Sequence, residues 1–247
     1  MAVKRWKSAR QVTGIAVHRS HFEAPKMDAA WPKSGNVGHV LVGRMRMRNG
    51  NNGKSSRHWV AIKMFKHPIP DSYAARYQRT IERLRKAGVN IPKMGMMKFA
   101  RAEGLRQEWH QVMQLFGNLR HGKLSTTRVH ASEAQRELAA VEAAKILNAG
   151  FAPPLDALTF FEHPRSGVVV VDIDSLIRSG AEESIGSLVK FSKKDKAANL
   201  VYVLRDLSKS RNQFYRLFDL AIQTVNPAWR PLVESFKEVF ARTIPDK

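Results

Sequence analysis

Three groups of residues have types and spacings that could serve phosphate chemistry. Lys63 lies in the middle of Trp-Val-Ala-Ile-Lys-Met-Phe-Lys, a segment that alternates as a half-buried strand does. Gly35 and Gly38 precede another alternating segment, and glycines let a backbone turn sharply and approach a phosphate. Asp172 and Asp174 leave the end of a run of four valines. Carboxylates placed there suit a hard divalent ion that bridges phosphates.

Each group also has an ordinary structural explanation. Lys63 could belong to an edge strand and point at solvent, and the glycines could form a simple turn before a strand. Asp174 could end its strand in an Asx turn and cap a following helix. Asp172 has no equally good structural explanation. The elements around these residues must therefore decide between the two interpretations.

The first half of the chain predicts an antiparallel sheet with one helix. Residues 33–48 read as a glycine turn and a strand, and residues 49–54 read as an exposed hairpin tip leading into the Lys63 strand. After Pro68 and Pro70, residues 73–87 have helical spacing, and Glu82 is their only acid. Two further strands are predicted, at Met94–Arg101 and Glu108–Leu115.

The second half predicts mainly helices. Ser132 caps a helix that runs to Asn148, with Leu138, Val141, Ile146 and Leu147 as its apolar stripe and Gly150 as its stop. Residues 151–161 read as a loop before the valine strand. Four more helices are predicted, around residues 181–192, 196–208, 211–224 and 229–243.

The order of these segments resembles the protein kinase-like superfamily. Val60-Ala61-Ile62-Lys63 is similar to the third kinase strand, and Gly35, Gly38 and Val40 match part of the glycine-rich pattern, with Lys33 in place of the first glycine. The segment around Asp172 is more similar to small-molecule and atypical kinases than to eukaryotic protein kinases. The resemblance covers about residues 33–225 and implies a two-lobed α+β fold.

The resemblance also implies a site that binds ATP and Mg²⁺. Lys63 would hold the phosphates, Glu82 would orient Lys63, Asp172 with Asp174 would hold the metal, and Asp156 would be the provisional base. The implied nucleotide-binding set is Gly35, Gly38, Val40, Ala61, Lys63, Glu82, Gln114 and Leu115. For Glu82, pairing with neighbouring arginines on the helix surface is the alternative.

The sequence departs from the kinase pattern at the catalytic loop. Pro154-Leu155-Asp156 stands where the family has His-Arg-Asp, and Phe161 stands where it has a metal-holding asparagine. No Ala-Pro-Glu segment follows Asp174. An active atypical phosphotransferase and a pseudokinase therefore both remain open.

Positive charge is concentrated in the first half of the chain. Residues 1–128 contain 26 Lys and Arg against 6 Asp and Glu, whereas residues 129–247 contain 16 against 15. This asymmetry predicts an anionic partner, most simply a nucleic acid or a ribonucleoprotein, with an acidic protein as the alternative. The candidate nucleic-acid-binding residues are Lys4, Arg5, Lys7, Arg44, Arg46, Arg48, Lys54 and Arg57.

These features predict a basic arm at residues 1–32, an N-terminal lobe at 33–117 and a helical C-terminal lobe at 118–247. The chain has no cysteine, which excludes disulfides and thiolate metal sites. No apolar run is long enough for a membrane span, so we expect a cytoplasmic protein without membrane contact. A non-catalytic nucleic-acid-binding or ribonucleoprotein-binding protein on a degenerate kinase-like scaffold is the alternative function.

Overall fold

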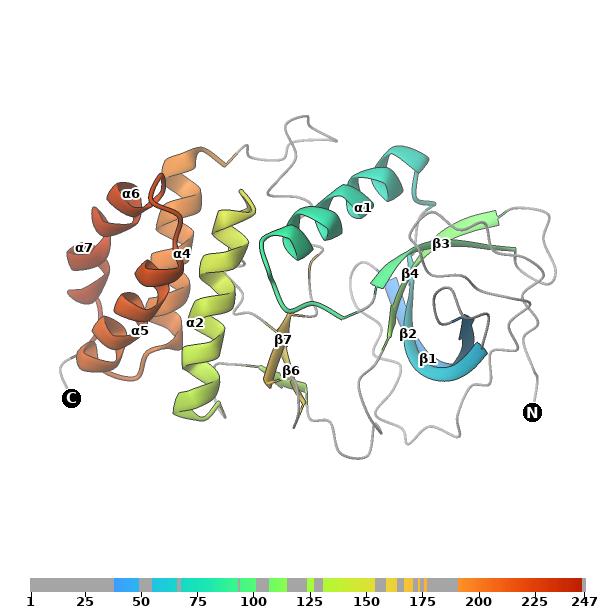
Figure 1. Cartoon of the computed structure of the whole chain (residues 1–247), viewed down its shortest axis with the longest axis horizontal. Helices are drawn as coiled ribbons and strands as arrows, with labels where there is room; N and C mark the ends of the chain where they lie inside the picture. Colours follow the sequence, from blue (N-terminus) through green and yellow to red (C-terminus); the bar gives the residue numbers. More distant parts are fainter. Residues whose placement is uncertain are drawn as a thin grey trace. The chain divides into compact units, whose positions relative to one another are not determined.

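Four antiparallel strands and one helix make up the described part of the first unit of the chain (Figure 1). The structure is a computed structural model. It describes residues 38–48, 55–65, 68–92, 94–100, 107–114, 124–126, 131–153, 159–163, 167–170, 173, 176 and 191–245. The first unit comprises residues 1–81 and 92–121, and the second comprises residues 82–91 and 122–247.

The sheet of the first unit has the strand order β1-β2-β4-β3. Its strands are β1 (Gly38–Arg48), β2 (Ser55–Phe65), β3 (Met94–Ala100) and β4 (Gln107–Gln114). All three pairings are antiparallel. The four predicted strands are therefore confirmed, although β1 begins at Gly38 and β2 begins at Ser55, four residues before Trp59.

Helix α1 (Asp71–Lys86) begins directly after Pro70. The Pro70 carbonyl accepts hydrogen bonds from the backbone amides of Tyr73 and Ala74. Its buried side is made by Ala74, Tyr77, Thr80, Ile81 and Leu84. This spacing of three and four residues is what an amphipathic helix requires. The helix ends near Gly88, whose φ of 73° is the left-handed conformation that glycine adopts without strain.

A second, smaller sheet belongs to the second unit. Its strands β5 (Leu124–Thr126), β6 (Thr159–His163) and β7 (Gly167–Val170) pair antiparallel in that order. The prediction of a loop over residues 151–161 was wrong at its end, because β6 begins at Thr159. Five residues are too few to show a period, and pairing with β5 and β7 is what makes them a strand.

Helices dominate the rest of the second unit. They are α2 (Glu133–Asn148), α4 (Lys193–Leu207), α5 (Arg211–Thr224), α6 (Arg230–Glu234) and α7 (Lys237–Ala241). Ser132 caps α2 as predicted, and it forms a capping box with Gln135. The helix predicted over 229–243 is instead two short helices, and the one predicted over 181–192 falls almost entirely outside the described residues.

The buried face of α2 is built mainly from alanines. Ala139, Ala140, Ala143 and Ala144 are fully buried, whereas Leu138 is 47% exposed. The stripe predicted through Leu138 was therefore wrong at that residue, although Ile146 and Leu147 are buried as predicted. Small side chains let α2 lie close to α4 and α5, which both pack against it.

These elements confirm the predicted α+β class, with an antiparallel N-terminal sheet and one helix followed by a mostly helical part. The structural division of the chain falls at residues 121 and 122, with residues 82–91 grouped with the second unit. Among the described helices, none combines the length and the apolar character that a membrane crossing needs.

Candidate nucleotide site

Lys63 lies on a central strand of the first sheet. Its strand β2 pairs with β1 on one side and with β4 on the other. In register, Lys63 is opposite Val40 of β1 and opposite Gln111 of β4, and Gln111 is opposite Met96 of β3. The row Val40, Lys63, Gln111 and Met96 therefore crosses the whole sheet. The alternative of an edge-strand lysine is excluded.

Two residues beside Lys63 on this face, Ala61 and Gln111, are buried. Cross-strand partners, and residues two apart on one strand, share a face of a sheet. Ala61 is 8% exposed and Gln111 is 7% exposed, while Lys63 itself is half-buried. Its ammonium lies 5.9 Å from the centre of the Phe65 ring. Because an ammonium is costly to bury, this position suits a cation that holds an anionic ligand.

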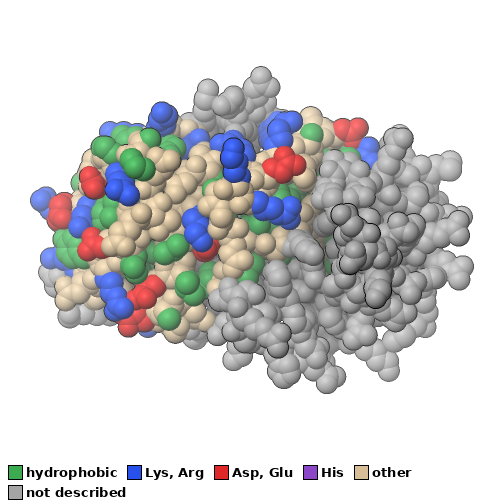
Figure 2. Space-filling model, in the orientation of Figure 1, with side chains coloured by type: hydrophobic (Ala, Val, Ile, Leu, Met, Phe, Trp, Pro, Cys, Tyr) green, Lys and Arg blue, Asp and Glu red, His purple; other side chains and the backbone are tan. Residues whose placement is uncertain are grey.

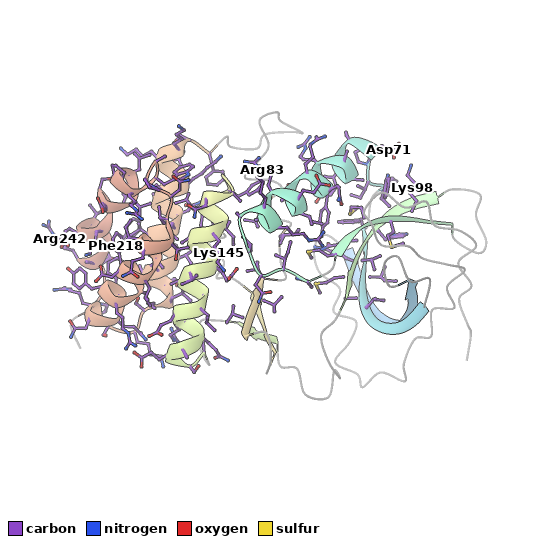
Figure 3. The ribbon with its side chains drawn as sticks, in the orientation of Figure 1. Asp71, Arg83, Lys98, Lys145, Phe218 and Arg242 are labelled. Carbon is purple, nitrogen blue, oxygen red and sulfur yellow. The ribbon has the colours of Figure 1, made fainter. Side chains whose placement is uncertain are left out.

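The first turn of α1 lies against the same face. The rings of Phe65 and Tyr73 meet edge to face at 6.2 Å. Asp71 Oδ1 accepts a hydrogen bond from Trp109 Nε1 at 2.6 Å and pairs with Lys98 Nζ at 2.7 Å (Figure 3). Phe65, Lys98 and Trp109 are each two residues from the row that contains Lys63. The sequence therefore brings helix and lysine to one side of the sheet.

The Asp71 contacts predict a dependence of stability on pH. Hydrogen bonding from Lys98, and next from Trp109, holds the pKa of Asp71 below the ordinary value of about 3.9. A lowered folded pKa stabilises the fold above the unfolded pKa, and this stabilisation is lost as pH falls through the folded pKa. We expect Asp71→Asn to lower the thermal midpoint at pH 7, and we expect this difference to shrink as the pH falls from about 3.9 through the folded pKa. A difference that stays constant to pH 2.5 would contradict it.

Glu82 is exposed on α1. It lies outside the buried side of the helix. The predicted ion pair between Lys63 and Glu82 is not tested by the described contacts and stays a prediction.

Several predicted site residues lie outside the described residues: Lys4, Arg5, Lys7, Gly35, Lys54, Leu115, Asp156, Asp172 and Asp174. For others only the strand position is described. Gly38 begins β1 and Gln114 ends β4, while Arg44, Arg46 and Arg48 are opposite Trp59, Arg57 and Ser55. Within the described ranges, no group of three His, Asp or Glu could hold a metal ion.

The strand that leads to Asp172 is anchored to the loop after α1. Asn90 Nδ2 donates to the carbonyl of Val168, and the amide of Val170 donates to the carbonyl of Asn90, both at 2.8 Å. The backbone amide of Asn90 in turn donates to Glu142 Oε2 of α2 at 2.7 Å. These bonds fix β7 two residues before Asp172.

Gln111 and this Asn90 anchor were not predicted from the sequence. Gln111 lies between Trp109 and Met113 on its face of β4, and its Oε1 is buried without a hydrogen-bond partner in the described structure. A polar residue between two apolar ones on a strand face was the available signal. For Asn90 and Glu142, which are 52 residues apart, no local signal existed.

No family model matches the chain. Among solved structures, the PAN3 pseudokinase of Neurospora crassa (a mutant) is similar over 96% of this chain, with 13% identity and a TM-score of 0.45. WaaP in complex with acyl carrier protein matches 81% of this chain and 84% of its own, at 17% identity and a TM-score of 0.38. The PAN3 pseudokinase of Drosophila melanogaster matches 91% of this chain, at 10% identity and a TM-score of 0.40.

The order β1, β2, α1, β3, β4 is the order that the resemblance to the kinase-like superfamily predicts. The chain spans 56% of the length of the first PAN3 structure and 61% of the second. Since every TM-score is below 0.5, these likenesses carry no argument about activity, ligand or partner. The proposed function rests on the residues of this chain.

Proposed function

We propose that this chain is a kinase-like protein that binds ATP with Mg²⁺, as an atypical phosphotransferase or a pseudokinase, and that its basic N-terminal half docks an anionic partner. The position of Lys63 carries the proposal. It is a half-buried cation on a central strand, on the face that α1 covers, beside Ala61 and the buried amide of Gln111. Buried lysines are usually paired with an anion, and a bound phosphate would be such a partner for Lys63.

In this proposal each residue has a role in positioning charge. Lys63 would contact the phosphates, Gly35 and Gly38 would let the backbone approach them, and Asp172 with Asp174 would supply oxygen ligands to Mg²⁺. The metal would neutralise phosphate charge when bound. Asp156 would receive the proton of an acceptor hydroxyl if the protein is active. Phe161 in place of the usual asparagine favours a pseudokinase.

Lys63→Met tests the nucleotide site. Methionine keeps the apolar stem of lysine and removes the charge, so we expect ATP·Mg²⁺ affinity to fall at least about tenfold, which corresponds to about 1.4 kcal/mol. Isothermal titration calorimetry measures it. The matched control is Lys194→Met, because Lys194 is exposed at the start of α4 and outside the proposed site. Equal affinities for the wild type and Lys63→Met would contradict the role of Lys63.

A non-catalytic nucleic-acid-binding or ribonucleoprotein-binding protein is the second candidate. The charge asymmetry of +20 in residues 1–128, from 26 minus 6, against +1 in the remainder, from 16 minus 15, favours it. Wild-type protein that binds nucleic acid but gives no heat with ATP, with or without Mg²⁺, would favour this candidate over the first.

A further inference from the structure

Four cations form a row along the outer side of α1. Arg76, Arg79, Arg83 and Lys86 are separated by three, four and three residues. At about 100° per residue, these four side chains fall within an arc of roughly 80° around the helix axis. This arc does not overlap the buried side of the helix. Arg79, Arg83 and Lys86 are exposed, and Arg76 is half-buried. We call these four residues the α1 stripe.

The four cations of the α1 stripe outnumber the acids near them, because Glu82 is the one acid of α1 beyond its first turn. Arg76, Arg79 and Lys86 have no carboxylate partner among the described residues. Asp71, in the first turn of α1, is already paired with Lys98. Arg216 of α5 differs, since it contacts both Glu133 and Glu137 at 2.6 Å. The stripe is therefore a local excess of positive charge.

The side chain of Arg83, one of the four cations of the stripe, is itself held by contacts with the loop after α2. Its Nη2 donates to the carbonyl of Ala149 at 2.7 Å, and its guanidinium lies 4.5 Å from the centre of the Phe151 ring. Gly150 leaves room for this contact, because a Cβ there would lie 2.5 Å from Arg83 Nη2. Figure 2 shows several Lys and Arg side chains, with an acidic side chain among them, over the part of the surface where Figure 1 places α1.

The row matches a partner with regularly spaced negative charges. Three or four helical residues advance about 4.5–6 Å along the axis, so the four cations face successive points on a linear polyanion. Three of the four are arginines, whose planar guanidinium group recognises phosphate in two-point contacts. The phosphate backbone of a nucleic acid has this chemistry.

An acidic protein fits the stripe less well, because protein interfaces need an apolar centre. Among the described residues, the large exposed apolar side chains are Leu138 of α2 and Val239 of α7, and none is on α1. We propose that the α1 stripe binds the phosphate backbone of a nucleic acid. This proposal rests on the anionic-partner part of the proposed function and locates that contact on a surface additional to the strand arginines.

The test changes Arg76, Arg79 and Lys86 together to glutamine and keeps Arg83, because Arg83 also holds Ala149. The matched control changes Lys193, Lys194 and Arg242 to glutamine, three exposed cations of α4 and the end of α7 with the same total charge. The probes are fluorescent single-stranded and double-stranded DNA and RNA 20-mers, measured by anisotropy between 50 and 200 mM salt. Thermal unfolding verifies that both variants are folded.

We expect the slope of log affinity against log salt to flatten by about 2–3 in the stripe variant, since each lost phosphate contact contributes about 0.7–0.9. The control should keep the wild-type slope. Equal flattening in both variants would overturn the proposal, since net charge alone would then explain binding. The proposal would also be overturned if the stripe variant bound like the wild type while a second variant, with Arg44, Arg46 and Arg48 changed to glutamine, lost binding. In that case the docking of nucleic acid would stand, but not its location on the α1 stripe.

Absence of wild-type binding to every probe at 50 mM salt would overturn both the α1 stripe and nucleic-acid docking. Polyglutamate then serves as the second probe. Binding of polyglutamate but not of nucleic acid would identify an acidic protein as the partner. The ATP titration is independent of these outcomes, so nucleotide binding stands or falls separately.

Discussion

Arg136→Ala is expected to lower the free energy of unfolding by about 3 kcal/mol. Arg136 of α2 is 2% exposed, and its Nε donates to the carbonyl of Ala131 at 3.2 Å. One of its terminal nitrogens donates to the carbonyl of Leu207, at the end of α4, where a cation is favourable for the helix dipole. Alanine would leave both carbonyls without this donor and would open a cavity.

The guanidinium itself is not fully compensated. Burial lowers the pKa of Arg136 below its ordinary value, and the charge of Asp206 opposes this shift. Its Nη2 has no hydrogen-bond partner within the described structure. Replacing a buried charge with an apolar residue of similar size can be neutral or stabilising. Arg136→Met therefore separates the two contributions.

Urea denaturation followed by circular dichroism at 222 nm measures both variants. We expect Arg136→Met to be less stable than the wild type, because it fills the volume but leaves the carbonyls of Ala131 and Leu207 unpaired. The control is Arg242→Ala, an exposed residue whose loss should change the free energy of unfolding by less than about 0.5 kcal/mol. A Met variant as stable as the wild type would mean that burying the charge costs as much as its hydrogen bonds contribute.

The elements that could be predicted from the sequence are those with a local signal. The segments that became β1 and β2 alternate along the chain, and α2 has Ser132 as its N-cap and Gly150 just after its C-cap. The face of α2 was harder, because the sequence offers Leu138 as an apolar residue at helical spacing. The alanines form the buried face instead, because α4 and α5 can approach α2 closely only where its side chains are small. Alanine patterns carry little hydrophobic signal of their own.

The candidate site could be predicted only in part, for the same reason. That Lys63 lies on a strand was local information, but its place on a central strand depends on pairing with β4, whose residues are about 50 positions further along the chain. Gln111 reaches the same row only through this pairing. For Glu82, the number of residues between it and Lys63 matched the kinase pattern and placed Glu82 on a helix. That number did not indicate on which side of the helix Glu82 lies.

The link between α2 and β7 predicts the second large effect. Glu142 is 6% exposed. It accepts a hydrogen bond from the backbone amide of Asn90 at 2.7 Å and pairs with Lys145 Nζ at 2.7 Å. Glu142→Ala would leave the part-buried backbone amide of Asn90 without its charged acceptor, and hydrogen bonds to charged groups contribute about 1.5–3 kcal/mol. We expect the free energy of unfolding to fall by about 3 kcal/mol, with Glu142→Gln losing less because its amide oxygen still accepts.

Stability alone would not distinguish this link from ordinary core packing, so the second measurement is hydrogen exchange at Val170. The Val170 amide donates to the carbonyl of Asn90, and Asn90 is held by Glu142. Glu142→Ala should therefore speed exchange at Val170 more than at Leu217 in α5. Lys145→Ala removes the part-buried ion pair with Glu142 but keeps the hydrogen bond from the Asn90 backbone amide, so it should speed exchange at Val170 less than Glu142→Ala does. Equal acceleration at Val170 and Leu217 would mean that Glu142 stabilises the second unit as a whole. A selective effect at Val170 would identify Glu142 and Asn90 as the residues that position the strand leading to Asp172, and would connect the helical core of the second unit to the proposed metal ligand.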